Sequence, residues 1–282
     1  MDNKIQNTTN YIMGAGIGYG TYKGTELLLK KATLKYIYPE KLSKNENLIY
    51  WDAGVKAHSE MNTDTIIRHI DKNNLEEMTK EIREKPFKYT TIDKIRKFLH
   101  IGKEKGISYW LKVISDGANA CFSNNYNEIW INKELRGVAL FHELGHSINF
   151  NSKGTKKFIH NSKKLVPLFA PAILFAGLLT NKPKKENPQE QTKINKTANF
   201  LKKNCGYLTA LFLAPIVIEE GLASYNGAKL AKKYLNKFDL ERMERMNAKS
   251  LLSYISMAVT AGLAVKAAVM ARDGIVNKNQ NS

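Results

Sequence analysis

Three long apolar runs constrain the possible folds of this chain more than any other feature of its sequence. Residues 165–180 and 204–218 contain no charged side chain, and residues 250–270 contain one, Lys266. As helices, the two uncharged runs would be about 24 and 22 Å long, short of the roughly 30 Å hydrocarbon core of a bilayer. Flanking lysines can extend that reach by placing their ammonium groups at the membrane surface. The runs therefore predict membrane helices, with buried core helices as the alternative.

The positions of these runs suggest five parts of the chain. A glycine-rich segment at 1–45 carries Gly16, Gly20 and Gly24, whose spacing of four would line one helix face. We interpret it as membrane-associated, because such spacing lets helices approach closely in lipid, with a flexible arm as the alternative. The other parts are a mixed region at 46–162, an apolar hairpin with a basic linker at 163–218, a helical segment at 219–248, and a C-terminal apolar helix and tail at 249–282.

The mixed region is expected to hold a small sheet. Residues 64–97 are charged and place apolar side chains at helical intervals, which predicts a solvated helical layer. Residues 108–115 and 120–132 alternate and are rich in β-branched and aromatic side chains, which predicts strands with a turn at Asn124. Asn132 is a good N-cap for the helix that follows. The expected fold class is mainly α with a small β-sheet.

The sharpest motif is H-E-x-x-H at residues 142–146. Four residues apart on a helix, His142 and His146 project from one face and can reach a single metal ion. Glu143 points to one side, where it can act as general base toward a water. Apolar neighbours predict that the helix is buried, where unpaired polar groups cost several kcal/mol. The motif therefore predicts a Zn²⁺ site, with a hydrogen-bonded structural histidine pair as the alternative.

A catalytic zinc site needs a third protein ligand and an open position. Glu219 and Glu220 begin a helix-prone stretch, and adjacent helical residues point about 100° apart, so only one of them can face the ion. We choose Glu220, because Ala223 and Ser224 beside it are small and would let its helix lie against Gly145 of the motif helix. Ser224 could also accept a hydrogen bond from the non-ligating nitrogen of a zinc-bound histidine.

In combination, three motifs resemble those of the integral-membrane zinc metalloproteases that include the CAAX prenyl protease and the HtpX-type heat-shock protease. Residues 119–122 (NACF) are similar to the N-A-F/Y edge-strand motif of that family, the H-E-x-x-H is shared, and residues 220–230 (EGLASYNGAKL) are similar to its E-x-x-x-D segment. HtpX-type members also place two membrane helices between the second and third motifs, where the two uncharged runs lie here. The resemblance covers residues 115–232.

This resemblance implies a zincin-like metallopeptidase core with an inserted membrane hairpin. The roles it implies are metal ligands of one Zn²⁺ ion at His142, His146 and Glu220, a base at Glu143, and a strand that pairs with an extended peptide or protein substrate at Asn119, Ala120, Cys121 and Phe122. Ser224 departs from the family, which has aspartate there, and a serine orients a ligand histidine less strongly. No residue is assigned to stabilise an oxyanion, and His160 is expected to be a packing residue.

The net charge of the chain limits the classes of binding partner to consider. The chain has 44 basic and 26 acidic residues, a formal charge of +18, which favours an anionic surrounding. Because the lysines are dispersed and no nucleic-acid-binding motif is present, we expect anionic membrane lipid and no nucleic acid. The expected function is a zinc-dependent, multi-pass membrane endopeptidase with its active site facing the cytoplasm. The alternative is a membrane-embedded binding or assembly protein whose zinc site is structural or inactive.

Overall fold

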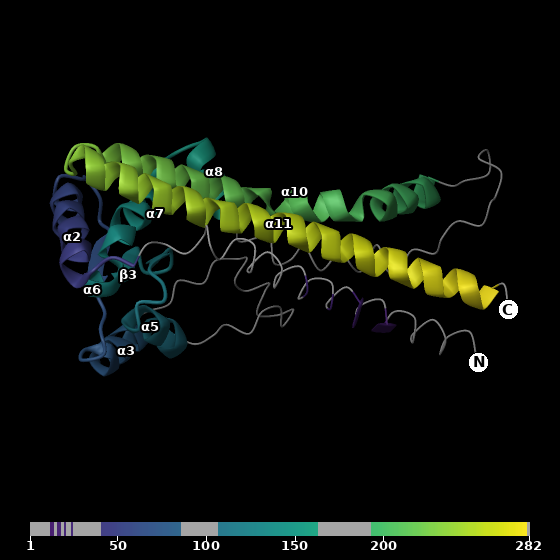
Figure 1. Ribbon diagram of the computed structural model, residues 1–282, viewed down its shortest axis with the longest axis horizontal. Coiled ribbons are helices and arrows are strands. Elements are labelled where there is room, and N and C mark those ends of the chain that lie inside the picture. The colour runs from purple at the N-terminus through teal and green to yellow at the C-terminus, as the bar shows by residue number, and fades with distance from the viewer. Residues whose placement is uncertain are drawn as a thin grey trace. The chain divides into compact units, whose positions relative to one another are not determined.

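The computed structural model describes residues 41–85, 107–162 and 193–280, with single positions between 12 and 24 (Figure 1). The apolar run at 165–180, which would form the first arm of the predicted hairpin, lies outside the described residues, as does most of the glycine-rich segment. The chain divides into two compact units. The first comprises Met1–Tyr38, Val166–Val217 and Leu252–Ser282, and the second comprises Pro39–Leu165 and Ile218–Leu251.

A three-stranded sheet lies at the centre of the second unit, in the order β1-β3-β2. β1 (Ile66–His69) runs parallel to β3 (Glu128–Ile131), and β2 (Cys121–Ser123) runs antiparallel to β3. Every residue of β3 is buried. Since neighbouring side chains of a strand point to opposite faces, Ile129 and Ile131 enter one core and Trp130 enters another. Both faces of the central strand are therefore covered.

Helices pack on both faces of the sheet. On the face of Ile129 lie α2 (Lys44–Ser59) and α7 (Leu140–Asn151), and on the face of Trp130 lie α3 (Leu75–Glu84) and α5 (Ile107–Ser115). α2 begins with a capping box, in which the Ser43 hydroxyl accepts from the Glu46 backbone N–H and the Glu46 carboxylate accepts from the Ser43 N–H. The predicted small sheet in a mainly helical chain is confirmed.

One predicted element in this unit is wrong, and a second is confirmed only in part. The alternation in residues 108–115 predicts a strand, but this segment belongs to helix α5. Its fully buried side chains, Leu111 and Ile114, recur at a helical interval and pack with Ile70 and Ile82, and a short apolar run does not distinguish the two periods by itself. Within the predicted helical layer at 64–97, which is described to residue 85, α3 is helical as expected. The segment also contains β1, and Ile70 and Ile82 are completely buried, so it is not solvated throughout.

The hairpin around Asn124 and the N-cap at Asn132 are confirmed. Asn132 precedes α6 (Lys133–Arg136), and its side-chain oxygen accepts from the backbone N–H of Glu134 and Leu135. The helix does not continue from there into the H-E-x-x-H motif as expected, because a 3-10 turn, η1 (Gly137–Ala139), separates α6 from α7. A Cβ at Gly137 would lie 2.0 Å from the backbone oxygen of Asn47, so only glycine fits where this turn meets α2.

Two long helices make up the described part of the first unit and extend into the second, α10 (Lys193–Ala231) and α11 (Lys237–Gln280). Within the first unit they run antiparallel, since Cys205 packs with Val269 and Leu213 packs with Ala258 (Figure 1). Both are long and apolar enough to cross a membrane, and only a minority of each apolar stretch is buried. α10 is unbroken at residue 218, so the second arm of the predicted hairpin and the third-ligand segment share one helix.

Candidate metal centre

The centre forms where α7 and α10 touch, and two glycines permit that contact. A Cβ added at Gly145 of α7 would lie 1.9 Å from the backbone oxygen of Ala223, and one added at Gly227 of α10 would lie 2.2 Å from that of Phe141. No real side-chain atom fits at such distances, so each glycine lets the opposing backbone come into direct contact. This is the close approach expected from Gly145, and it brings Glu219 and Glu220 onto the histidines of α7.

Three donor atoms of the predicted ligands converge at one point. His142 Nε2 lies 3.0 Å from His146 Nε2 and 3.2 Å from Glu220 Oε2, and His146 Nε2 lies 3.6 Å from the same oxygen. Tetrahedral ligands at the usual zinc bond lengths lie about 3.3–3.4 Å from one another. The three atoms are therefore spaced like ligands around a single ion, and the group could hold a metal.

The charge around His146 favours a cation at this point. Burial disfavours the charged form of its ring, but hydrogen bonds to Glu219 and Glu220 outweigh burial and raise the pKa of His146 to about 10. The charge of Glu143 acts in the same direction. A divalent metal ion is a stronger local charge than a proton and satisfies the same preference.

Ser224 and Glu143 lie beside the predicted ligands. His142 Nδ1 is 3.1 Å from Ser224 Oγ, which is the contact expected from the sequence. Glu143 is buried in the first turn of α7. Burial raises the pKa of the Cys121 thiol on β2, and the carboxylate of Glu143 raises it further, so Glu143 is close to that strand as well as to His146.

The predicted substrate strand coincides with a sheet edge. Cys121 and Phe122 belong to β2, with exposed Asn119 and buried Ala120 directly before it. In the sheet order, β2 is the outermost strand next to β3. Among the described residues, no other strand pairs with its free side, so β2 has an edge at which an extended peptide could be added.

Two residues of the centre were not assigned from the sequence, which gives Glu219 only a place at a helix start and His160 a packing role. Glu219 Oε1 lies 2.8 Å from His146 Nδ1 and 2.7 Å from Nδ1 of His160, which is on α8 (Thr155–Ser162). By spacing alone these three residues are a second group that could hold a metal. The sequence feature that could have indicated Glu219 is its position next to Glu220. Two adjacent carboxylates on a helix that contacts an imidazole can reach both nitrogens of that ring.

Comparisons with protein-family models, with curated protein sequences and with solved structures give no match for this chain. The likeness to integral-membrane metalloproteases therefore rests on its three short motifs.

Proposed function

We propose that this chain is a zinc-dependent membrane endopeptidase. The observation that carries the proposal is the convergence of His142, His146 and Glu220 at the spacing of zinc ligands. Glu143 follows His142 on the same helix, and its charge acts on His146. The side chains of His142 and Glu220 keep 16% and 11% of their surface exposed. That opening suits a catalytic site, which keeps one coordination position for water or substrate, better than a closed structural site.

The residues of the chain have distinct roles in this reaction. A bound Zn²⁺ ion supplies a Lewis acid and lowers the pKa of water to about 7. Glu143 accepts a proton from the attacking water and returns it to the leaving amine. The edge of β2 binds the extended substrate through main-chain hydrogen bonds, which accommodates many sequences. Ser224 accepts the Nδ1 proton of His142, so that Nε2 of that ring offers its lone pair.

Membrane attachment, with more than one span, is the second part of the proposal. It is supported by the apolar length of α10 and α11, most of which is not buried within the protein. A core helix of a water-soluble protein would instead be largely buried. The net charge of +18 suits a surface of anionic lipid.

The proposal is tested with Glu143→Gln in the full-length, detergent-purified chain. We expect zinc content by elemental analysis to remain at one per chain, because residue 143 is not a ligand. Cleavage of casein should fall by about 10²–10⁴-fold, the usual contribution of a general base. Glu220→Ala is the matched variant that should lose zinc and cleavage together. Undiminished cleavage by Glu143→Gln would exclude this role for the glutamate.

A second function is favoured by Ser224. A neutral hydroxyl supports His142 where the resembled family has a charged carboxylate, which fits a binding or assembly protein with a structural or inactive zinc site. A wild-type chain that binds one zinc yet cleaves neither casein nor unfolded membrane proteins would favour this function over the endopeptidase.

A further inference from the structure

His146 takes part in two groups, one at each ring nitrogen. Its Nε2 faces His142 and Glu220, whereas its Nδ1 faces Glu219, which also contacts His160. A metal ion bound at one nitrogen takes the place of the proton there, and the ring is left with one N–H that donates to a hydrogen-bond acceptor at the other nitrogen. One side of His146 is therefore a ligand side, and the other is a hydrogen-bonding side.

The interatomic distances differ between the Nδ1 side and the Nε2 side of the His146 ring. On the Nδ1 side, Glu219 Oε1 lies 2.8 Å from His146 and 2.7 Å from His160, within the range of about 2.7–2.9 Å for N–H groups that donate to a carboxylate. Zinc ligands would lie farther apart, at about 3.3–3.4 Å. Atoms on the Nε2 side have that wider spacing on average.

The residues on the two sides of the ring also differ in their exposure to solvent. The side chains of Glu219 and His160 are 0% exposed, whereas His142 and Glu220 remain partly open. A metal ion has no solvent-facing position on the closed side, and a buried carboxylate is stabilised there by N–H donors. Both criteria place the ion on the Nε2 side and hydrogen bonds on the Nδ1 side.

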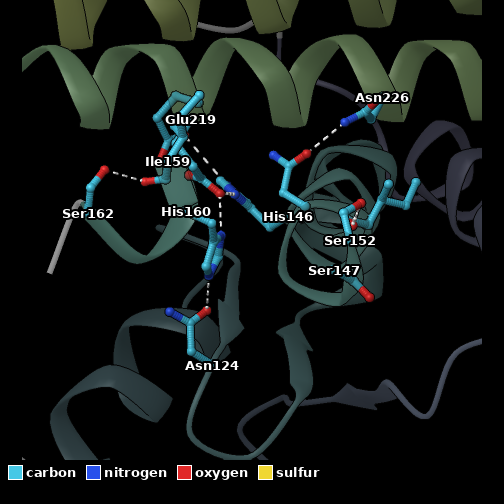
Figure 2. A network of polar contacts seen from close by, with 12 residues as sticks. Asn124, His146, Ser147, Ser152, Ile159, His160, Ser162, Glu219 and Asn226 are labelled. Atoms are coloured by element: carbon cyan, nitrogen blue, oxygen red, sulfur yellow. Dashed lines mark hydrogen bonds and ion pairs between the residues drawn. The ribbon is translucent and has the colours of Figure 1, made fainter. Parts of the chain in front are cut away.

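We propose that Glu219 is the positioning carboxylate of the metal ligand His146, and that His160 and Asn124 hold it in place. Glu219 accepts the Nδ1 proton of His146, which leaves the lone pair on Nε2 and fixes the rotation of the ring. His160 donates from Nδ1 to the same oxygen, and its Nε2 lies 2.9 Å from the side-chain amide oxygen of Asn124 (Figure 2).

This network joins the metal centre to the substrate strand. Asn124 lies in the turn between β2 and β3, His160 on α8, Glu219 on α10 and His146 on α7 (Figure 2). The rings of Phe122 on β2 and Phe150 on α7 pack against His160, with centroids at 6.2 and 5.5 Å, and restrict its orientation. The edge strand and the second ligand histidine are thus positioned by one set of contacts. The inference rests on the metal-binding part of the proposed function and does not depend on peptide cleavage.

The test measures Zn²⁺ affinity by competition with a chromogenic chelator in the full-length, detergent-purified chain. Glu219→Gln keeps the size of the side chain and removes its charge, and we expect about 10–100-fold weaker binding with one site retained, because loss of a partner behind a ligand has that effect. His160→Gln and Asn124→Ala should weaken binding in the same direction by smaller factors. The visible absorption of the Co²⁺-substituted protein should shift in Glu219→Gln, because the ligand behind that contact becomes less basic.

Asn226→Ala is the matched control. Its amide donates to Asn149 at 2.7 Å, a buried contact between the same two helices, α10 and α7, that does not involve a ligand (Figure 2). We expect a lower melting temperature for this variant, with unchanged Zn²⁺ affinity and Co²⁺ spectrum. A general packing role for Glu219 would instead give its variant the same pattern as Asn226→Ala.

Several results would overturn the inference. Unchanged affinity and spectrum in Glu219→Gln would do so, and if that variant does not fold, unchanged values in both His160→Gln and Asn124→Ala would have the same force. Two zinc ions per wild-type chain, with one lost in His160→Gln, would show a second metal site in place of a positioning network. A chain that meets all these affinity expectations but cleaves no peptide would refute the endopeptidase and leave the positioning role of Glu219 standing.

Discussion

The two histidines of the candidate metal centre have chemically different hydrogen-bond partners. His146 Nδ1 faces the carboxylate of Glu219 at 2.8 Å, whereas His142 Nδ1 faces the hydroxyl of Ser224 at 3.1 Å. Hydrogen bonds to a charged acceptor are roughly twice as strong as those to a neutral one. In the proposed metal centre, His146 is therefore the more firmly held ring, and the support of His142 is the weaker of the two.

Replacement of Ser224 tests this difference. Ser224→Ala removes the acceptor behind His142, and we expect Zn²⁺ binding to weaken by about 10-fold, at the lower end for such contacts. Ser224→Asp supplies a charged acceptor and should bind Zn²⁺ more tightly than wild type. Chelator competition measures both. Tyr225→Phe, at an exposed neighbour, should leave affinity unchanged, and a Ser224→Ala protein with wild-type affinity would mean that packing alone holds the ring of His142.

Some residues of the centre could be predicted from their spacing in the sequence, and others could not. His142 and His146 could be predicted because i, i+4 spacing fixes their relation within one helix turn. Glu220 could be chosen because small neighbours indicate a close helix contact. Glu219 and His160 could not be paired from the sequence, because their contact depends on where α8 packs relative to α10, which no local pattern encodes.

The crossing of α7 and α10 determines the centre at the level of whole helices. Ala223 on α10 is fully buried, and its backbone oxygen occupies the space where Gly145 of α7 has no side chain. A backbone oxygen cannot move aside as a flexible side chain can, so the crossing has a fixed separation. The distances among the atoms of the candidate metal centre follow from that separation.

Gly145→Ala should therefore damage the centre more than an ordinary helix substitution. Its Cβ would meet the Ala223 oxygen at 1.9 Å, and we expect at least the roughly 1–3 kcal/mol loss in unfolding free energy typical of overpacking, with reduced zinc content. Thermal unfolding and elemental analysis measure the two effects. Gly221→Ala is the control on α10, since its Cβ would meet only Leu251 side-chain atoms at 3.8 Å, and it should be neutral or stabilising by up to about 1 kcal/mol. Equal behaviour of the two variants would contradict a fixed crossing.

Helices and strands could be predicted where the apolar periodicity of a segment agreed with the turn or capping residues at its ends. The hairpin around Asn124 and the cap at Asn132 have turn and capping residues at fixed positions, and both are present. Segment 108–115 was mispredicted because eight residues fit either period, and its helical form is selected by packing against α3 and β3. The unbroken course of α10 through Pro215 likewise depends on its surroundings, since proline usually interrupts a helix.

The molecule combines two units of different surface character. The second unit has a sheet whose central strand is covered on both faces. The described helices of the first unit instead expose large apolar side chains at helical intervals. These residues, between 41% and 81% exposed, are Tyr207 and Leu211 on α10 and Leu252, Ile255, Val259 and Leu263 on α11. Exposed apolar side chains at such intervals are consistent with the lipid contact proposed above, and both helices are long and apolar enough to cross a membrane.

Membrane insertion makes a specific prediction for the exposed face of α11. Wild-type chain should stay in the membrane fraction in 1 M salt, because salt screens attachment by charge but does not weaken apolar insertion. The double variant Val259→Lys with Leu263→Lys should shift toward the soluble fraction, since each charge near the middle of a span costs about 2.5–3.5 kcal/mol. Both positions are at least half exposed, so the substitutions disturb little internal packing. Glu241→Lys, an exposed site on the same helix before the apolar stretch, should fractionate like wild type. If the double variant fractionates like Glu241→Lys, this face of α11 does not contact lipid.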